Sequence, residues 1–228
     1  MKAIILAGGK GTRFLPLTEN IPKALIPVSG KTVIELALDT LPSEIDTVII
    51  TTKHHGHAIE ENLGATYKGK KLIYSPQPKD MDGTWAAFCA ARPYITDDEL
   101  FCVFGCDDLY SMEELVGIIK SGKIGMGVTA TTLPAKYHRV VIGNDGYMGG
   151  LERHPHQNRE AFVEDIFANG FFLLDSQAFS FEPVQLIDGE YGLPQTLLAQ
   201  KETYPLFAHP MESWQPCNTF EDLEKINK

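Results

Sequence analysis

The sequence lacks the features of several classes of protein. Its 20 Lys and Arg residues are outnumbered by 30 Asp and Glu residues, and the formal charge of -10 argues against nucleic-acid or anionic-lipid partners. Only 4 cysteines occur, and none forms a C-x-x-C pair, so neither a disulfide scaffold nor a structural zinc site is expected. We expect these cysteines to be reduced thiols.

Long hydrophobic runs are also missing. Only five apolar residues stand between Lys2 and Gly8, which is too few for a signal-peptide core and far below the roughly 18 to 20 that span a bilayer. We therefore expect a soluble, cytoplasmic protein. With 228 residues, 43% of them hydrophobic, the chain can bury a large core, and we expect a single domain, 1–228.

The first half of the chain alternates short apolar strands with helices. We predict strands at 2–7, 47–51, 71–75 and 100–104, and helices at 32–41, 58–63, 84–91 and 111–122. Two of these helices begin with the S/T-x-x-E pattern of a capping box, at Thr32 to Glu35 and at Ser111 to Glu114. Such alternation requires right-handed crossovers, and it predicts an α/β fold with a doubly wound, mostly parallel sheet.

The pattern changes after residue 124. Strand-like segments at 126–133, 140–142 and 168–174, with the turn signal Asn144-Asp145-Gly146, predict a small antiparallel portion. A last helix is predicted at 220–227, capped by Thr219. We therefore divide the chain into a first half, 1–124, and a second half, 125–228.

The most informative segment follows the first strand. Gly8, Gly9 and Gly11 allow backbone amides to point into one concavity, which is how a protein without bulk positive charge can hold a polyphosphate. Arg13 and Lys23 then supply local charge, one as a bidentate fork and the other as a point charge. The G-x-G-x-x-G and P-loop patterns both fail, because Phe14 and Leu25 stand where they require glycine.

Residues 6–18, L-A-G-G-K-G-T-R-F-L-P-L-T, and residues 22–28, P-K-A-L-I-P-V, resemble the signature of the sugar-1-phosphate nucleotidyltransferases. The resemblance implies a Rossmann-like nucleotidyltransferase fold, a nucleoside triphosphate and a sugar 1-phosphate as partners, Mg²⁺ as cofactor, and possible homo-oligomers. It also implies that Arg13 contacts the departing phosphates and Lys23 stabilises the reacting phosphate. The segment that wraps the triphosphate would comprise Leu6, Ala7, Gly8, Gly9, Gly11 and Thr12.

Two further segments of the first half resemble that family. Gln77, Gly83 and Thr84 match its base-binding segment, although the spacing is one residue longer, and Gln77 could instead be a loop residue between two prolines. Asp107 matches the aspartate that coordinates Mg²⁺. It could instead cap the helix that follows, a role for which Asp108 is better suited. The resemblance makes 1–124 the nucleotide-binding half.

In the sugar-binding half, 125–228, the resemblance places Glu152, Asn169, Gly170 and Glu190 against the sugar. Arg153 or His154 would replace a lysine that contacts the sugar phosphate. The tail from Trp214 to Leu223 also resembles the family, but Pro216 replaces its second metal-binding aspartate. Asp107 would then hold Mg²⁺ with phosphates and water alone. The cluster His54, His55 and His57 is predicted to be solvated and without function.

These observations predict an enzyme that transfers a nucleoside monophosphate from a nucleoside triphosphate to a sugar 1-phosphate, releasing pyrophosphate and forming a nucleotide sugar. One alternative is a cytidylyltransferase of a small alcohol phosphate such as phosphocholine, with Trp85, Tyr191 and Trp214 around the cationic head group. The other is a catalytically weakened regulatory subunit that binds nucleotide sugars, an interpretation motivated by Pro216 and by Cys106, which replaces the usual glycine.

Overall fold

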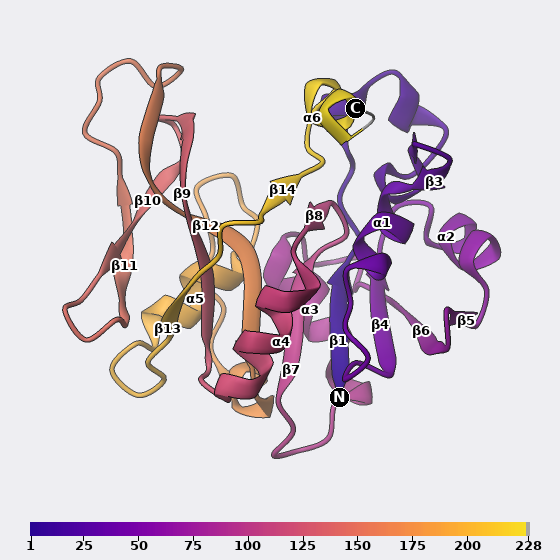
Figure 1. Ribbon diagram of the computed structural model, residues 1–228, viewed down its shortest axis with the longest axis horizontal. Helices are drawn as coiled ribbons and strands as arrows, with labels where there is room; N and C mark the ends of the chain where they lie inside the picture. Colours follow the sequence, from indigo (N-terminus) through magenta and orange to yellow (C-terminus); the bar gives the residue numbers. More distant parts are fainter. Residues whose placement is uncertain (227–228) are drawn as a thin grey trace.

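The computed structural model describes residues 1–226 and shows an α/β fold around one ten-stranded sheet (Figure 1). Its parallel part contains β1 (Lys2–Leu6), β4 (Thr47–Thr52), β6 (Lys70–Pro76) and β7 (Phe101–Gly105). These strands lie in the order β6-β4-β1-β7. The chain thus adds β4 and β6 on one side of β1 and then adds β7 on the other side. The strand order therefore reverses between β1 and β7, and ligands bind at the carboxyl ends of strands at such a point.

Helices cover both faces of the parallel strands. One core contains side chains of α1 (Val33–Asp39), α2 (Gly56–Leu63) and α4 (Met112–Ser121), and the opposite core contains those of α3 (Thr84–Ala90) and α5 (Leu193–Ala199). In β1, Ala3 and Ile5 belong to the first core and Ile4 to the second. This burial on both faces explains why the strand is apolar from Ala3 to Leu6.

The second half adds mostly antiparallel strands, which we call the arm. The arm consists of β9 (Gly125–Pro134), β10 (His138–Ile142), β11 (Met148–Arg153), β12 (Phe162–Leu174) and β13 (Phe207–Pro210). Of these, β13 pairs parallel with β9. β12 joins the arm to the parallel half by pairing with β7, and it also pairs with β9 (Figure 1). Its register shifts between Ala168 and Phe172, where Gly170 has a φ of 84°. This bulge lies at the junction of the two parts of the sheet.

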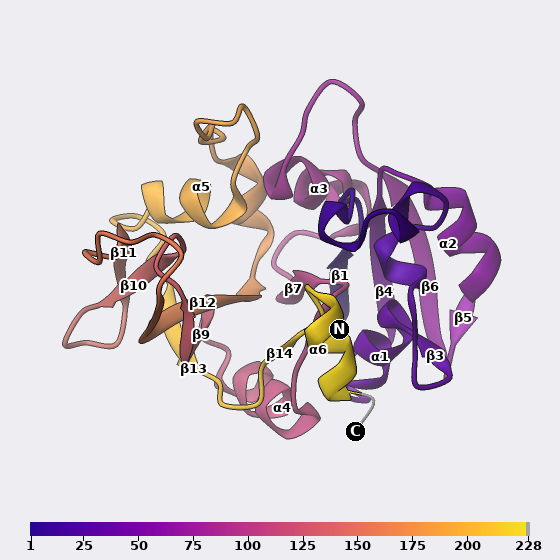
Figure 2. The same cartoon turned by 90° about the horizontal axis from the view of Figure 1, so that it is seen from above.

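The tail, residues 212–226, returns from the arm to the carboxyl end of β1 (Figures 1 and 2). Its strand β14 (Gln215–Pro216) pairs with β8 (Asp108–Leu109), and the helix α6 (Phe220–Ile226) follows. The Phe220 ring meets Phe14 edge to face at 5.1 Å. The remaining short elements are β2 (Pro27–Val28), β3 (Lys31–Thr32), β5 (Thr66–Tyr67) and 3-10 helices at Thr12–Phe14, Leu17–Glu19, Lys23–Leu25, Arg92–Tyr94 and Ser176–Ser180.

The structure confirms the predicted fold class and corrects one of its details. The capping box of Thr32 and Glu35 is formed, but the one predicted for Ser111 and Glu114 is not. The Glu114 carboxylate instead accepts hydrogen bonds from the tail, including the backbone N–H of Glu212 at 2.7 Å. A contact distant in sequence has displaced the local cap. The predicted end of the last helix, at 227, lies outside the described residues.

The division into a nucleotide-binding half and a sugar-binding half stays a prediction, since the sheet itself is continuous across residue 124. Within residues 1–226, every helix is too short or too polar to pass through a lipid bilayer.

Candidate active site

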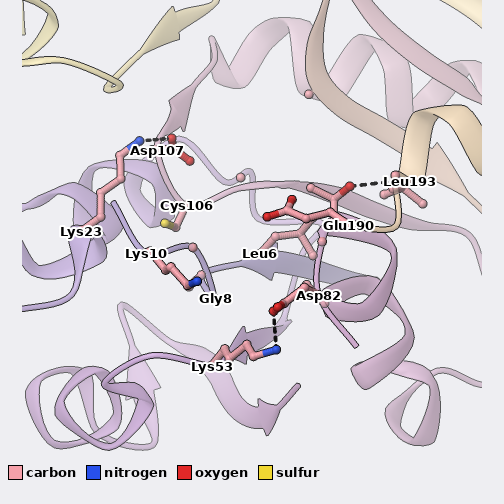
Figure 3. A pocket seen from close by; sticks show the side chains of 18 of the residues that line it. Leu6, Gly8, Lys10, Lys23, Lys53, Asp82, Cys106, Asp107, Glu190 and Leu193 are labelled. Atoms are coloured by element: carbon pink, nitrogen blue, oxygen red, sulfur yellow. Dashed lines mark hydrogen bonds and ion pairs between the residues drawn. The ribbon is translucent and has the colours of Figure 1, made fainter. Parts of the chain in front are cut away.

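A cavity of about 740 Å³ opens at the carboxyl ends of β1 and β7, where the strand order reverses (Figure 3). Both halves of the chain line it. The first half contributes the segment 6–14, Lys23, Lys53, His54, Gln77, Asp82 to Thr84 and Gly105 to Asp108. The second half contributes Gly170, parts of β9 and β12, the segment 190–195 and Asn218 of the tail.

The glycine-rich loop needs glycine for two physical reasons. Gly11 has a φ of 63°, and a Cβ atom there would lie 3.0 Å from both the Cβ of Lys23 and the Cγ2 of Thr18. A Cβ atom on Gly8 would lie 2.9 Å from the Oε1 atom of Gln77. The loop therefore packs directly on Lys23 at one end and on Gln77 at the other. Side chains in this loop would separate the two residues from the cavity wall.

Lys23 lies at the centre of a polar contact between three distant segments. Its ammonium forms an ion pair with the Asp107 carboxylate, as Figure 3 shows, and donates a hydrogen bond to Oδ1 of Asn218 at 2.8 Å. These partners are 84 and 195 positions away in the sequence. Lys23 and Asp107 are only 13% and 20% exposed, so their mutual attraction is screened less than that of a surface pair.

Asp108 is buried beside this pair. Trp214 donates a hydrogen bond from Nε1 to its carboxylate at 2.8 Å, and burial together with the charge of Asp107 raises the pKa of Asp108 well above its usual range. The alternative role of Asp108 as a helix cap is not found, because its carboxylate binds Trp214 of the tail and Ser111 begins α4 without a side-chain cap. The tail therefore completes the wall of the cavity next to Asp107.

Two buried thiols lie under the same carboxylates. Burial and the neighbouring aspartates raise the pKa of the Cys106 thiol, and they raise the pKa of Cys217 to about 12. Both thiols are therefore neutral at physiological pH. All four cysteines, including Cys89 and Cys102, are free thiols.

Arg13 connects the glycine-rich loop to the arm. Its Nη2 atom donates a hydrogen bond at 3.2 Å to the hydroxyl of Tyr137, which lies in the turn between β9 and β10. Both side chains are exposed, and Arg13 lines the cavity. The residue that the sequence assigned to the phosphates thus contacts the second half of the chain directly.

The residues predicted to bind the base lie together on one wall. The Nε2 atom of Gln77 donates to the backbone carbonyl of Met81 at 2.8 Å, which fixes the amide. Gly83 has a φ of 103°, and a Cβ atom there would lie 2.4 Å from the carbonyl oxygen of Tyr191. The hydroxyl of Thr84 accepts a hydrogen bond from the backbone N–H of Leu193 at 2.9 Å. These contacts fasten the second half to the base-side loop.

The sequence analysis did not predict that charged residues, among them Lys53 and Asp82, lie beside the residues predicted to bind the base. Lys53 pairs with Asp82 and donates to the carbonyl of Met81 at 3.0 Å, so it holds the loop that is one residue longer than in the family (Figure 3). His54 lines the cavity, and burial together with Lys10 and Lys53 lowers its pKa. A lysine directly after a parallel strand was the available signal, because that position faces the ligand edge of the sheet.

The predicted sugar-binding residues are only partly brought together. Gly170 and Glu190 line the cavity. Asn169 is buried, and its amide donates to Thr129 at 3.1 Å inside the arm. Glu152 lies outside the cavity, because it belongs to β11, the outer strand of the arm. The Glu152 carboxylate pairs with Arg139 at 3.0 Å.

Arg153 is exposed on the same outer strand as Glu152, and His154 lies 3.7 Å from Asp165, so neither lines the cavity. Of the three aromatic residues considered for a cationic head group, Tyr191 lines the cavity. Trp85 is buried in the core and Trp214 is bound to Asp108. These three rings therefore form no common cage.

Comparisons with known proteins concern the family and the fold of the chain. The family model described as "Nucleotidyl transferase" matches residues 2–212. The bifunctional protein GlmU of Methanocaldococcus jannaschii is 27% identical over 179 residues, which are 78% of this chain and 41% of the relative. The low-salt glycan biosynthesis nucleotidyltransferase Agl11 of Haloferax volcanii is 32% identical over the whole chain and 65% of the relative. The chain thus spans less than half the length of its GlmU relatives from methanogens.

Solved structures show the same architecture. A UDP-glucose pyrophosphorylase complexed with UDP-glucose superposes with a TM-score of 0.82 at 20% identity, covering 99% of this chain and 96% of the other. A putative glucose-1-phosphate thymidylyltransferase from Bacillus anthracis gives a TM-score of 0.78 at 25% identity over 100% and 94%. The resemblance drawn from the glycine-rich loop is confirmed, and the chain belongs to the nucleotidyl transferase family.

Proposed function

We propose that this chain transfers a nucleoside monophosphate from a nucleoside triphosphate to a sugar 1-phosphate, releasing pyrophosphate and forming a nucleotide sugar. The observation that carries the proposal is the placement of Lys23 and Asp107 against each other beside the glycine-rich loop, in a cavity of about 740 Å³ that both halves line. The names of the similar proteins, among them UDP-glucose pyrophosphorylase and glucose-1-phosphate thymidylyltransferase, support the same reaction class.

The chemistry needs positioning and charge stabilisation more than a base. An oxygen of the sugar phosphate, already an anion, forms the new bond to the α-phosphorus while the bond to the bridging oxygen of the β-phosphate breaks. Pyrophosphate leaves with that electron pair, so no proton has to be removed. The backbone amides of the glycine-rich loop and the two cations Arg13 and Lys23 stabilise the charge that two approaching anions create.

A divalent cation, which the family generally requires, fits the oxygen donors of this site. Among residues 1–226 there is no group of three or more His, Cys, Asp or Glu side chains that could form a closed metal cage. An open site remains, with the carboxylate of Asp107 and the phosphate oxygens of the substrate, and Mg²⁺ commonly binds in this manner. When bound there, Mg²⁺ would neutralise charge on the phosphates.

We assign the base to the wall that contains Leu6, Ala7, Gln77, Gly83 and Thr84, and the sugar to the side that contains Gly170 and Glu190. The triphosphate then follows Gly8, Gly9, Gly11 and Thr12 toward Lys23. The phosphocholine alternative is supported less well, since Tyr191 lines the cavity but Trp85 and Trp214 do not.

The test is a product assay. The protein is incubated with Mg²⁺, each of the four common nucleoside triphosphates and a panel of hexose 1-phosphates, together with phosphocholine, and products are identified by mass spectrometry. We expect one nucleotide sugar with equimolar pyrophosphate. CDP-choline as the product would establish the alternative, and the absence of any product with retained nucleotide-sugar binding would indicate a regulatory subunit.

A further inference from the structure

The ammonium of Lys53 contacts three acceptors of the base-side loop, residues 78–83. It pairs with the carboxylate of Asp82, as Figure 3 shows, and donates to the backbone carbonyl of Met81 at 3.0 Å. The carbonyl of Pro78 lies 3.5 Å from the same ammonium. An ammonium has three N–H donors, so these three acceptors can use all of them. Because only 15% of the Lys53 side chain is exposed, water can replace these contacts only in part.

The carbonyl of Met81 is shared between Lys53 and Gln77. The Nε2 atom of Gln77 donates to it at 2.8 Å, so the two lone pairs of the carbonyl oxygen are both used. Lys53 thereby fixes the acceptor that determines which end of the Gln77 amide faces the base-side loop. The other end, Oε1, lies against the glycine-rich loop, where a Cβ atom on Gly8 would approach it to 2.9 Å. Gln77 is buried and lines the cavity.

Lys53 is itself held at the ligand edge of the sheet. It follows β4 directly, and at the end of that strand the carbonyl of Thr52 accepts a hydrogen bond from the backbone N–H of Gln77 at 2.7 Å. A Cβ atom on Gly8 would lie 3.3 Å from the Cβ of Lys53 and 3.4 Å from its backbone nitrogen. Lys53 therefore packs against the glycine-rich loop while its ammonium reaches the base-side loop. One side chain thus joins the segment proposed to hold the triphosphate to the segment proposed to bind the base.

We propose that Lys53 is a positioning residue for base recognition, which holds the Met81 carbonyl and, through it, the amide of Gln77 in one orientation. With Nε2 bound to Met81, Gln77 presents Oε1 as an acceptor and one remaining N–H as a donor. A base with the complementary edge satisfies both groups, whereas a base with the reverse pattern leaves them unpaired at a cost in affinity. This inference rests on the proposed function, because it assumes that the cavity binds a nucleoside triphosphate.

The experiment measures the binding of UTP and of CTP to the full chain by isothermal titration calorimetry, which does not depend on turnover. Uracil and cytosine present opposite donor and acceptor patterns at the same two ring positions. The two Kd values should differ at least about tenfold in the wild type, and Lys53→Met should reduce their ratio to about threefold or less. Lys70→Met is the matched control, since the Lys70 ammonium donates to the carbonyls of Pro42 and Ile45, each at 2.7 Å, outside the cavity. It should lower the thermal midpoint but keep the wild-type ratio.

A double variant tests whether Lys53 acts through Gln77. Gln77→Ala removes the amide that Lys53 positions, so adding Lys53→Met to it should not change the ratio further. A further decrease in the double variant would mean that Lys53 acts on the base by another route, and it would overturn the proposed role.

The outcomes separate this inference from the proposed function. A wild-type ratio in folded Lys53→Met, or equal affinities for UTP and CTP in the wild type, would overturn the role of Lys53 while leaving the transfer reaction intact. Discrimination that depends on Lys53, without any product in the mass assay, would overturn the reaction and support the role. No nucleotide binding to the wild type would overturn both. Where Lys53→Met unfolds, Asp82→Asn replaces it, because Asp82 is 55% exposed and its loss removes one of the three acceptors. It should lower the ratio about threefold, and an unchanged ratio would overturn the role.

Discussion

The parallel half and the second half line one cavity, but they present their side chains to it differently. In the parallel half, residues that follow strand ends reach the cavity, as Arg13, Lys53 and Asp107 do. In the arm, side chains alternate between faces and many pair within the arm, as Glu152 does with Arg139. Position after a parallel strand therefore predicts access to the ligand, whereas position along an antiparallel strand does not.

The largest effect should come from the centre of the parallel half. We expect Lys23→Ala and Asp107→Ala each to lower kcat roughly 10²- to 10³-fold, because each removes charge that is positioned at the reacting phosphate. Steady-state pyrophosphate release with the substrates identified by the product assay measures this. Lys31→Ala is the control, since Lys31 pairs with Asp39 outside the cavity and should retain wild-type kcat. Wild-type activity in Lys23→Ala would contradict the proposed chemistry.

The junction between the halves should show the next effect, on stability. A methyl group in Gly83→Ala would meet the backbone of Tyr191 at 2.4 Å, and that backbone also accepts from the N–H of Trp85 at 3.0 Å. Gly189 also has a positive φ, of 88°, but open space around it. Gly189→Ala should therefore lower the free energy of unfolding by roughly 1 kcal/mol, and Gly83→Ala by at least roughly 2 kcal/mol more.

Urea denaturation of both variants measures this difference. Equal losses would mean that the backbone of Tyr191 moves away freely, and that the second half is only loosely fastened to the base-side loop.

These two regions also differ in how much of them could be predicted from the sequence. The sequence allowed us to predict the glycine-rich loop, Lys23 and Asp107 as site residues. Their prediction depends on local backbone requirements and on the order of parallel strands, and a single sequence reveals these two features. The contacts of Asn218 with Lys23 and of Glu114 with the tail are not, since they depend on where the tail returns after about 100 residues or more. Likewise, the bulge at Gly170 decides which face Asn169 occupies, and a one-residue shift in register reverses that face.

Two acidic residues of the second half test whether lining the cavity, rather than resemblance to the family alone, identifies a residue that binds the sugar phosphate. Glu190 lines the cavity and Glu152 does not. We expect Glu190→Gln to raise the KM for the sugar phosphate roughly tenfold, about 1.4 kcal/mol, and Glu152→Gln to leave it within about twofold. Titration of the sugar phosphate at saturating nucleotide gives both values. A larger effect of Glu152→Gln would show that the outer strand of the arm reaches the substrate after all.

The smallest effect concerns the response of the arm to pH. His209 on β13 is buried, its Nε2 atom contacts the carbonyl of Lys123 at 2.9 Å, and burial together with the charge of Lys123 lowers its pKa below the usual 6.5. The unfolded chain then binds a proton at a pH where the folded protein does not. Stability is therefore fully present above about pH 6.5 and decreases as the pH falls toward the lower folded pKa.

His209→Gln retains an N–H donor for the carbonyl of Lys123 but does not titrate. We therefore expect the thermal midpoint of this variant to fall less between pH 7.5 and pH 5.5 than that of the wild type, measured by circular dichroism. His57→Gln is the matched control, because His57 is exposed on α2 in the parallel half beside Glu61, and it should keep the wild-type dependence. If His209→Gln loses as much stability on acidification as the wild type, the pH response does not originate at His209.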